Sequence, residues 1–172
     1  VYNYSLDPTS YAYDFVVGSS DLLLTGVGIH DDGAAGLAHD HPVAVWESDG
    51  SPVASGTVPA GTVAALLGDF RFADIATPVT LYAGQSYVIG AWYPDGGDAA
   101  FVPASWNPSG HPDFAALGAN SAAFESDALL FPSGLNQTGP FLGPSFQYTV
   151  VPEPGTLALF VLGGATVALS RN

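Results

Sequence analysis

The stretch VAVWESDGSPVASGTV, residues 43–58, carries the clearest fold signal in the chain. In VAVWES the residues Val43, Val45 and Glu47 alternate with their neighbours, which is the period of two of a β-strand. Asp49-Gly50 then supplies the positive φ values that a tight hairpin turn needs. The segment SPVASGTV returns as the second strand. The stretch therefore predicts an antiparallel hairpin, which is a building block of all-β folds.

The rest of the chain repeats this design of short apolar runs between turn residues. Its 21 glycines and 14 prolines interrupt the chain every few positions, a pattern typical of an all-β sandwich or jelly roll. The expected strands cover residues 11–17, 22–30, 42–48, 53–58, 70–75, 79–82, 86–93, 128–131 and 145–151. Residues 94–120 are loop-rich and predict no element. We expect one β-sandwich domain over residues 1–151 and a separate segment over residues 152–172.

The composition of the chain is strongly acidic. Lysine is absent, and Arg71 and Arg171 stand against 16 acids, for a formal net charge of -14. Such a surface repels nucleic acid and anionic lipid, so we exclude a nucleic-acid partner. Cysteine is also absent, which excludes a disulfide framework and thiol chemistry. The chain begins at Val1 and has no methionine, which we interpret as removal of an N-terminal signal peptide during export.

The last 21 residues differ from everything before them. Pro152, Glu153 and Pro154 form a stiff, extended spacer, because proline fixes its own φ and restricts the residue before it. An apolar run over residues 157–169 follows, and then the single cation Arg171. The run predicts a helix roughly 22 Å long, which is short for a hydrocarbon core about 30 Å thick. Since this helix is apolar on every side, lipid or protein must cover it.

The order of Pro-Glu-Pro triplet, apolar helix and Arg171 closely resembles the PEP-CTERM sorting signal of Gram-negative bacteria. The membrane protease exosortase recognises that signal. The resemblance implies an exported protein of the outer cell surface or the extracellular space. It assigns Pro152, Glu153, Pro154 and Arg171 to the sorting signal.

The middle of the chain carries a second resemblance. GIHDDGAAGLAHDHPVAVWESDG, TVPAGT, FRFADI, PVTLYAGQSYVIGAWY and GPSFQYTV follow one another in an order similar to a domain that recurs in PEP-CTERM proteins. That domain is a β-sandwich without an assigned activity. It has a Trp-bearing strand that turns at Asp-Gly and a later strand that follows an Ala-Gly-x-x-Tyr motif. The resemblance supports the fold prediction and implies no particular chemistry.

One polar cluster could hold a metal ion. It consists of His30, Asp31, Asp32, His39, Asp40 and His41. Calcium prefers carboxylate and carbonyl oxygens, so Asp31, Asp32 and Asp40 are the candidate Ca²⁺ ligands, whereas imidazoles would suit a transition metal. The alternative, which we favour, is a polar turn in which Asp and Gly serve the turn geometry.

Signatures of an enzyme are missing from the sequence. It has no Gly-x-Ser-x-Gly elbow, no Walker loop and no cysteine nucleophile, and we expect no catalytic activity. Aromatic side chains could instead form a platform for stacking sugars, although in β-sandwiches such residues more often fill the core. The candidates are Tyr2, Tyr4, Tyr11, Tyr13, Tyr82, Tyr87, Trp92, Tyr93 and Trp106.

Two hypotheses of function lead, and an extracellular hydrolase is the least supported alternative. The first is a structural protein of the cell surface or biofilm matrix that self-associates, as a filament subunit, through its C-terminal helix. The contact residues would be Leu157, Leu159, Phe160, Leu162, Gly163, Gly164, Val167 and Leu169, with the two glycines allowing close approach of helices. The second is a calcium-dependent carbohydrate-binding module that acts on exopolysaccharide. Exosortase or the membrane is an expected partner during export in both cases.

Overall fold

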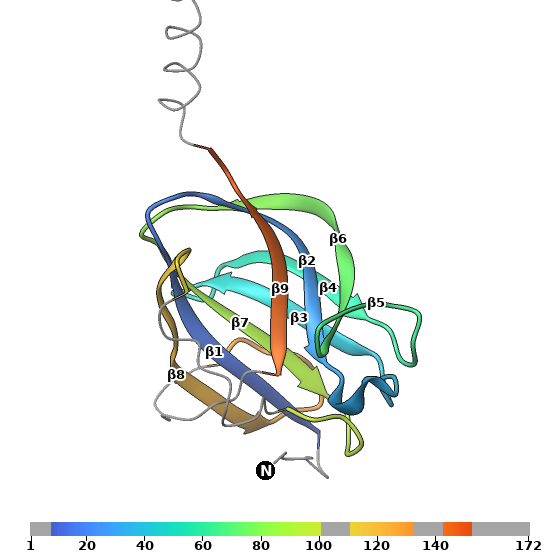
Figure 1. Ribbon diagram of the computed structural model, residues 1–172. Coiled ribbons are helices and arrows are strands. Elements are labelled where there is room, and N and C mark those ends of the chain that lie inside the picture. Colours follow the sequence, from blue (N-terminus) through green and yellow to red (C-terminus); the bar gives the residue numbers. More distant parts are fainter. Residues whose placement is uncertain (1–7, 101–110, 133–142, 153–172) are drawn as a thin grey trace, which may run out of the picture.

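Two antiparallel sheets form the protein in the computed structural model, which describes residues 8–100, 111–132 and 143–152 (Figure 1). The strands are β1 (Thr9–Val17), β2 (Leu22–His30), β3 (His41–Glu47), β4 (Pro52–Val58), β5 (Ala65–Leu67), β6 (Phe70–Leu81), β7 (Ser86–Tyr93), β8 (Phe114–Glu125) and β9 (Pro144–Val150). One sheet has the order β4-β3-β7-β1-β8 and the other the order β5-β6-β2-β9. A short 3-10 turn, η1 (Asp32–Ala34), lies between β2 and β3. The described residues contain no α-helix, and the predicted all-β class is confirmed.

The predicted hairpin at Asp49-Gly50 is present as β3 and β4. Val43 pairs with Gly56, and the register shifts at a bulge beside Trp46. Gly50 has a φ of 92°, the left-handed value that favours glycine. The Asp49 carboxylate accepts a hydrogen bond of 2.8 Å from the Ser51 amide, which closes the turn from its own side chain.

A single apolar core lies between the two sheets. From the five-stranded sheet it receives the inward-facing side chains of β1, β3 and β7, and from the other sheet those of β2 and β6. The largest fully buried side chains include Tyr93, Phe15, Leu24, Ile29 and Ile89. Alternation along each strand places these residues on one side. Because both sheets supply this one core, the described residues form one packing unit.

The outer face of the five-stranded sheet is also covered. Ala12, Ala44, Trp46 and Val88 form a second cluster there, against which Leu129 and Phe131 pack. The rings of Trp46 and Phe131 meet edge to face with centroids 5.7 Å apart. The prediction of a strand over residues 128–131 is therefore wrong. A short apolar run suggests a strand, but here the segment is irregular chain in which Leu129 and Phe131 are partly buried against the sheet while Ala128 and Leu130 stay exposed.

Further differences from the predicted strands have physical causes. β6 is one strand through Pro78, not two, because the residues around Pro78 lie where the pairing with β2 is irregular, between Val79 and Asp74, and proline is tolerated at such a site. β5 was not predicted, since three exposed residues carry no period. β8 was not predicted either, and it begins at Phe114 inside the stretch read as loop.

Candidate functional site

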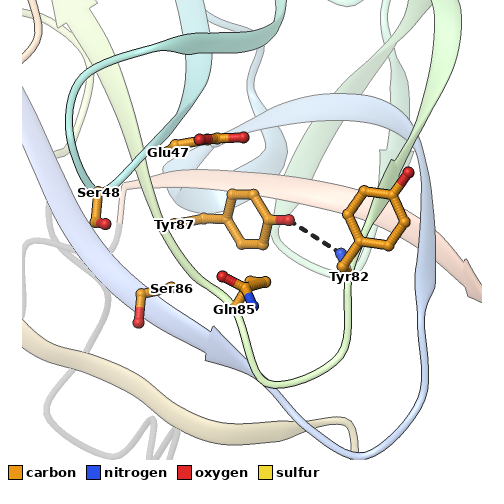
Figure 2. A pocket seen from close by; sticks show the side chains of 6 residues that line it. All are labelled: Glu47, Ser48, Tyr82, Gln85, Ser86 and Tyr87. Carbon is orange, nitrogen blue, oxygen red and sulfur yellow. Dashed lines mark hydrogen bonds between the residues drawn. The ribbon is translucent and has the colours of Figure 1, made fainter.

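A shallow hollow at one end of the five-stranded sheet combines an exposed aromatic ring with several polar side chains, which makes it a candidate site. Its volume is about 240 Å³, and its lining residues are Glu47, Ser48, Tyr82, Gln85, Ser86 and Tyr87 (Figure 2). Glu47 ends β3 and lies directly opposite Tyr87 of β7. Tyr82 and Gln85 belong to the turn between β6 and β7. The site is thus made by a strand end and a tight turn.

Several hydrogen bonds hold that turn in place. Gly84 has a φ of 73°, and its amide donates to the carbonyls of Val17 and Gly18. The Ala83 amide donates to the Asp21 carboxylate over 2.8 Å. The Tyr82 amide donates to the Tyr87 hydroxyl over 3.0 Å. These contacts account for the Ala-Gly-x-x-Tyr pattern, because each member either allows or secures the turn.

The two tyrosines of the hollow play different parts. The Tyr82 side chain stands out from the turn and the residue is 60% exposed, whereas Tyr87 is 4% exposed. Burial raises the pKa of Tyr87, with the hydrogen bond from Tyr82 acting in the opposite direction and the charge of Glu47 adding to the rise. The Tyr87 hydroxyl therefore stays protonated at neutral pH. Because it accepts from the Tyr82 amide, its own proton is left to donate.

The remaining polar side chains of the hollow are not engaged. Within residues 8–100, 111–132 and 143–152, no hydrogen bond or ion pair reaches the carboxylate of Glu47, the amide group of Gln85 or the hydroxyls of Ser48 and Ser86. In Figure 2 the carboxylate of Glu47 and the side chain of Gln85 lie on opposite sides of the Tyr87 ring. The hollow therefore offers the exposed ring of Tyr82 together with hydrogen-bond donors and acceptors that have no partner among the described residues.

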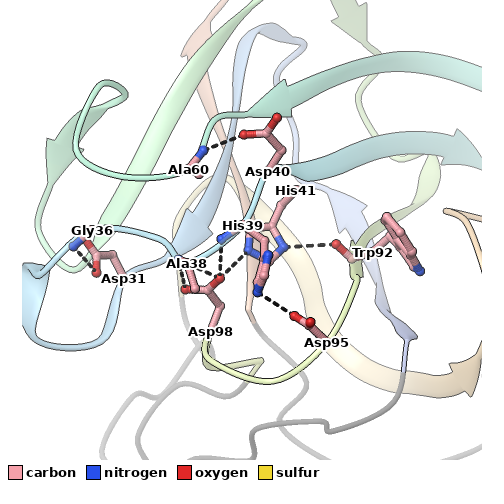
Figure 3. A network of polar contacts seen from close by, with 10 residues as sticks. All are labelled: Asp31, Gly36, Ala38, His39, Asp40, His41, Ala60, Trp92, Asp95 and Asp98. Carbon is pink, nitrogen blue, oxygen red and sulfur yellow. Dashed lines mark hydrogen bonds and ion pairs between the residues drawn. The ribbon is translucent and has the colours of Figure 1, made fainter.

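The proposed calcium ligands have other partners. The Asp31 carboxylate is 2.6 Å from Nε of Arg71, and it also accepts from the Gly36 amide (Figure 3). Asp40 accepts a hydrogen bond of 2.7 Å from the Ala60 amide. Asp32 opens the 3-10 turn η1. In the part of the chain that the structure describes, no group of three His, Cys, Asp or Glu side chains is placed to hold a metal ion.

Two histidines of the same cluster, His39 and His41, fasten neighbouring loops. His41 is fully buried, with Nε2 2.9 Å from the Asp98 carboxylate and Nδ1 3.0 Å from the Trp92 carbonyl oxygen. Asp98 also accepts from the backbone amides of Ala38 and His39, and the His39 ring meets Asp95 (Figure 3). Each nitrogen of the His41 ring therefore faces an oxygen, one near the end of β7 and one in the loop after it. The cluster thus joins the loop before β3 to the loop after β7.

The pKa of Asp98 reflects these contacts. Burial acts to raise the pKa of Asp98. Hydrogen bonds from His41, Ala38 and His39, together with the nearby imidazole, lower it by more, so the net pKa lies below the usual value of a carboxyl group. The sequence analysis missed Asp98 and Arg71. A signal existed in the run DGGD that ends at Asp98, but nothing in the sequence states which loop that carboxylate reaches.

The aromatic platform is largely core. Tyr11, Tyr13 and Tyr93 are at most 3% exposed, and Tyr11 and Tyr93 pack edge to face at 5.3 Å. The Trp92 indole donates to the Ser126 carbonyl over 2.7 Å. Tyr82 alone among the described candidates presents most of its surface to solvent. Tyr2, Tyr4 and Trp106 lie outside the described residues.

Of the residues assigned to the C-terminal segment, Pro152 is among the described ones. Pro152 is exposed and lies two residues after the end of β9. Glu153, Pro154, Arg171 and the whole predicted assembly helix, residues 157–169, lie outside the described residues. Within the described residues there is no helix that is both long and apolar enough to span a membrane.

Comparison with known families identifies the C-terminal segment. The PEP-CTERM protein-sorting motif matches residues 150–172. This motif indicates export to the cell surface or beyond, with exosortase acting during sorting, and it is typical of Gram-negative bacteria. No curated protein matches the chain, and no solved structure does.

Proposed function

Because the chain carries a PEP-CTERM sorting motif, we propose that it is a non-enzymatic surface protein whose β-sandwich binds polysaccharide at the Tyr82 hollow. The motif accounts for delivery. It matches residues 150–172 and none of the residues before them, so it says nothing about the task of the sandwich. The described residues bear on the second of the two hypotheses drawn from the sequence. Among these residues no three His, Cys, Asp or Glu side chains are grouped to hold a metal ion, so the proposal does not include calcium.

The exposed ring of Tyr82 is the observation that carries the proposal. It lies on a turn pinned by hydrogen bonds and is surrounded by the free polar groups of Glu47, Gln85 and the two serines. A pyranose ring has an apolar face of C–H bonds and a rim of hydroxyls. An aromatic surface beside a few fixed polar groups is the arrangement that binds such amphipathic ligands.

The size of the hollow suits one sugar ring of a longer polymer. Its volume of about 240 Å³ is below the roughly 300–1,000 Å³ common for pockets that enclose small molecules. A shallow site of this kind leaves both ends of a chain free to continue. This favours internal residues of a polysaccharide over a free monosaccharide.

Binding of purified polysaccharide to the Tyr82→Ala variant tests the proposal. We expect removal of the ring to weaken binding at least fivefold, the factor that corresponds to about 1 kcal/mol. Val63→Ala is the control, because Val63 is 86% exposed and does not line the hollow. Equal affinities of the two variants, or no binding of any polysaccharide by the unchanged protein, would reject the proposed function.

Self-association through the C-terminal segment is the second candidate. Its support is the contrast within the sequence between an acidic domain and the uncharged run from Gly155 to Ser170. Burial of apolar side chains at about 1.5–3 kcal/mol each outweighs much of the repulsion between acidic domains. Light scattering on the full chain and on a chain ending at Val151 tests it. If both run as monomers without detergent, the segment serves sorting alone.

A further inference from the structure

We propose that the hollow selects glycans that carry protonated amino groups, such as polymers containing glucosamine units without N-acetyl groups. This inference rests on the proposed function and names the ligand class of the same site. Three observations carry it: the charge of the surface, the position of Glu47 and the free donors and acceptors around Tyr82.

The surface of the sandwich has no arginine or lysine side chain to offer an anionic polymer. Lysine is absent from the chain, and Arg71, the only cation before Arg171, is 4% exposed and paired with Asp31. Fifteen of the 16 acids precede Glu153. Polymers of uronic acids or phosphates would therefore be repelled, whereas cationic polymers would be attracted.

Glu47 places a negative charge within the hollow itself. It is exposed at the end of β3, opposite Tyr87, and its charge contributes to the raised pKa of the Tyr87 hydroxyl. Asp21, which holds the turn through the Ala83 amide, adds to the same negative potential. In Figure 2 the Glu47 carboxylate extends above the Tyr87 ring on the side of Tyr82.

This arrangement fits an ammonium group better than a neutral acetamide. The carboxylate of Glu47 accepts a charge-assisted hydrogen bond from the ammonium, and the ring of Tyr82 adds a cation–π attraction. The Tyr87 proton, the Gln85 amide and the two serine hydroxyls remain for the sugar hydroxyls. An N-acetyl group in the same position removes the positive charge and adds a bulkier group beside the carboxylate.

Titration calorimetry with three tetramers tests the inference. The probes are glucosamine, N-acetylglucosamine and galacturonic acid tetramers, each measured against the full chain at low ionic strength. Because Glu47 is exposed, its ion pair is worth at most about 1 kcal/mol, so we expect Glu47→Gln to weaken glucosamine binding up to about fivefold. We expect the effect to vanish near 1 M salt, where the Debye length falls to about 3 Å.

Glu125→Gln is the matched control. Glu125 is an exposed acid outside the hollow, so its replacement changes the net charge by the same amount. Weaker binding of glucosamine in Glu47→Gln and unchanged binding in Glu125→Gln support the inference. Equal losses in the two variants, or N-acetylglucosamine bound as tightly as glucosamine, overturn it. Those outcomes leave the polysaccharide site intact as long as Tyr82→Ala still weakens binding of the neutral tetramer, so the two proposals fail separately.

Discussion

Replacement of Arg71 by methionine should destabilise the protein strongly. The Arg71 side chain is 5% exposed and meets the Asp31 carboxylate, itself 3% exposed, at 2.6 Å. Its guanidinium also donates to the carbonyls of Ala64, over 3.0 Å, and of Thr62 and Ala34, each over 3.3 Å. One side chain therefore ties β6 to the loop that follows β2 and to the segment before β5.

The size of the loss follows from this burial. Removing one partner of a buried ion pair leaves an unpaired charge and costs about 3–5 kcal/mol. For a chain of this length, about 2–4 °C of melting temperature corresponds to each kcal/mol. We therefore expect Arg71→Met to lower the melting temperature by roughly 6–20 °C. Asp74→Asn, at an exposed position on the same strand, is the control and should change the melting temperature little.

The double variant Arg71→Met with Asp31→Asn separates the two parts of the effect. Asparagine removes the unpaired charge, so the double variant should be more stable than Arg71→Met alone. Thermal and urea unfolding of the unchanged protein, of Arg71→Met, of Asp31→Asn and of the double variant measure this coupling. A loss below about 1 kcal/mol in Arg71→Met, or a double variant no more stable than that single one, would refute the reasoning.

Three further predictions concern acid stability, the covered outer face and calcium. The pKa of Asp98 is lower in the folded protein than in the unfolded chain. Its contribution to stability is therefore complete above the unfolded pKa and is lost as the pH falls through the folded pKa. Asp98→Asn should flatten the acid limb of a curve of stability against pH, and an unchanged slope would contradict this. Phe131→Ala should cost about 1–3 kcal/mol, less than for a fully buried phenylalanine, because Phe131 is only partly buried against Trp46. An unchanged free energy of unfolding in that variant would contradict this prediction. Millimolar calcium should leave the melting temperature unchanged, and a rise that disappears in Asp31→Asn would restore the metal hypothesis.

The site is a case in which the sequence indicates the candidates and not their roles. The aromatic candidates included Tyr82, Tyr87 and Tyr93, yet residue type alone does not separate an exposed ring from a buried one. Tyr82 is exposed because it lies one residue past the end of β6, whereas Tyr87 lies on an inward-facing position of β7. Ser48 and Gln85 carry no sequence signal of a site, since both are ordinary turn residues.

Local chemistry explains what the sequence by itself determined. The period of two and the Asp49-Gly50 turn are properties of neighbouring residues, so the hairpin and the all-β class follow from them. The C-terminal sorting motif is likewise a linear pattern that needs no folded context. The tertiary structure alone decided the pairing of Asp31 with Arg71, 40 residues away, and the packing of Phe131 on Trp46. Those contacts depend on how distant segments are brought together, and a buried charge or ring takes whatever partner the fold places beside it.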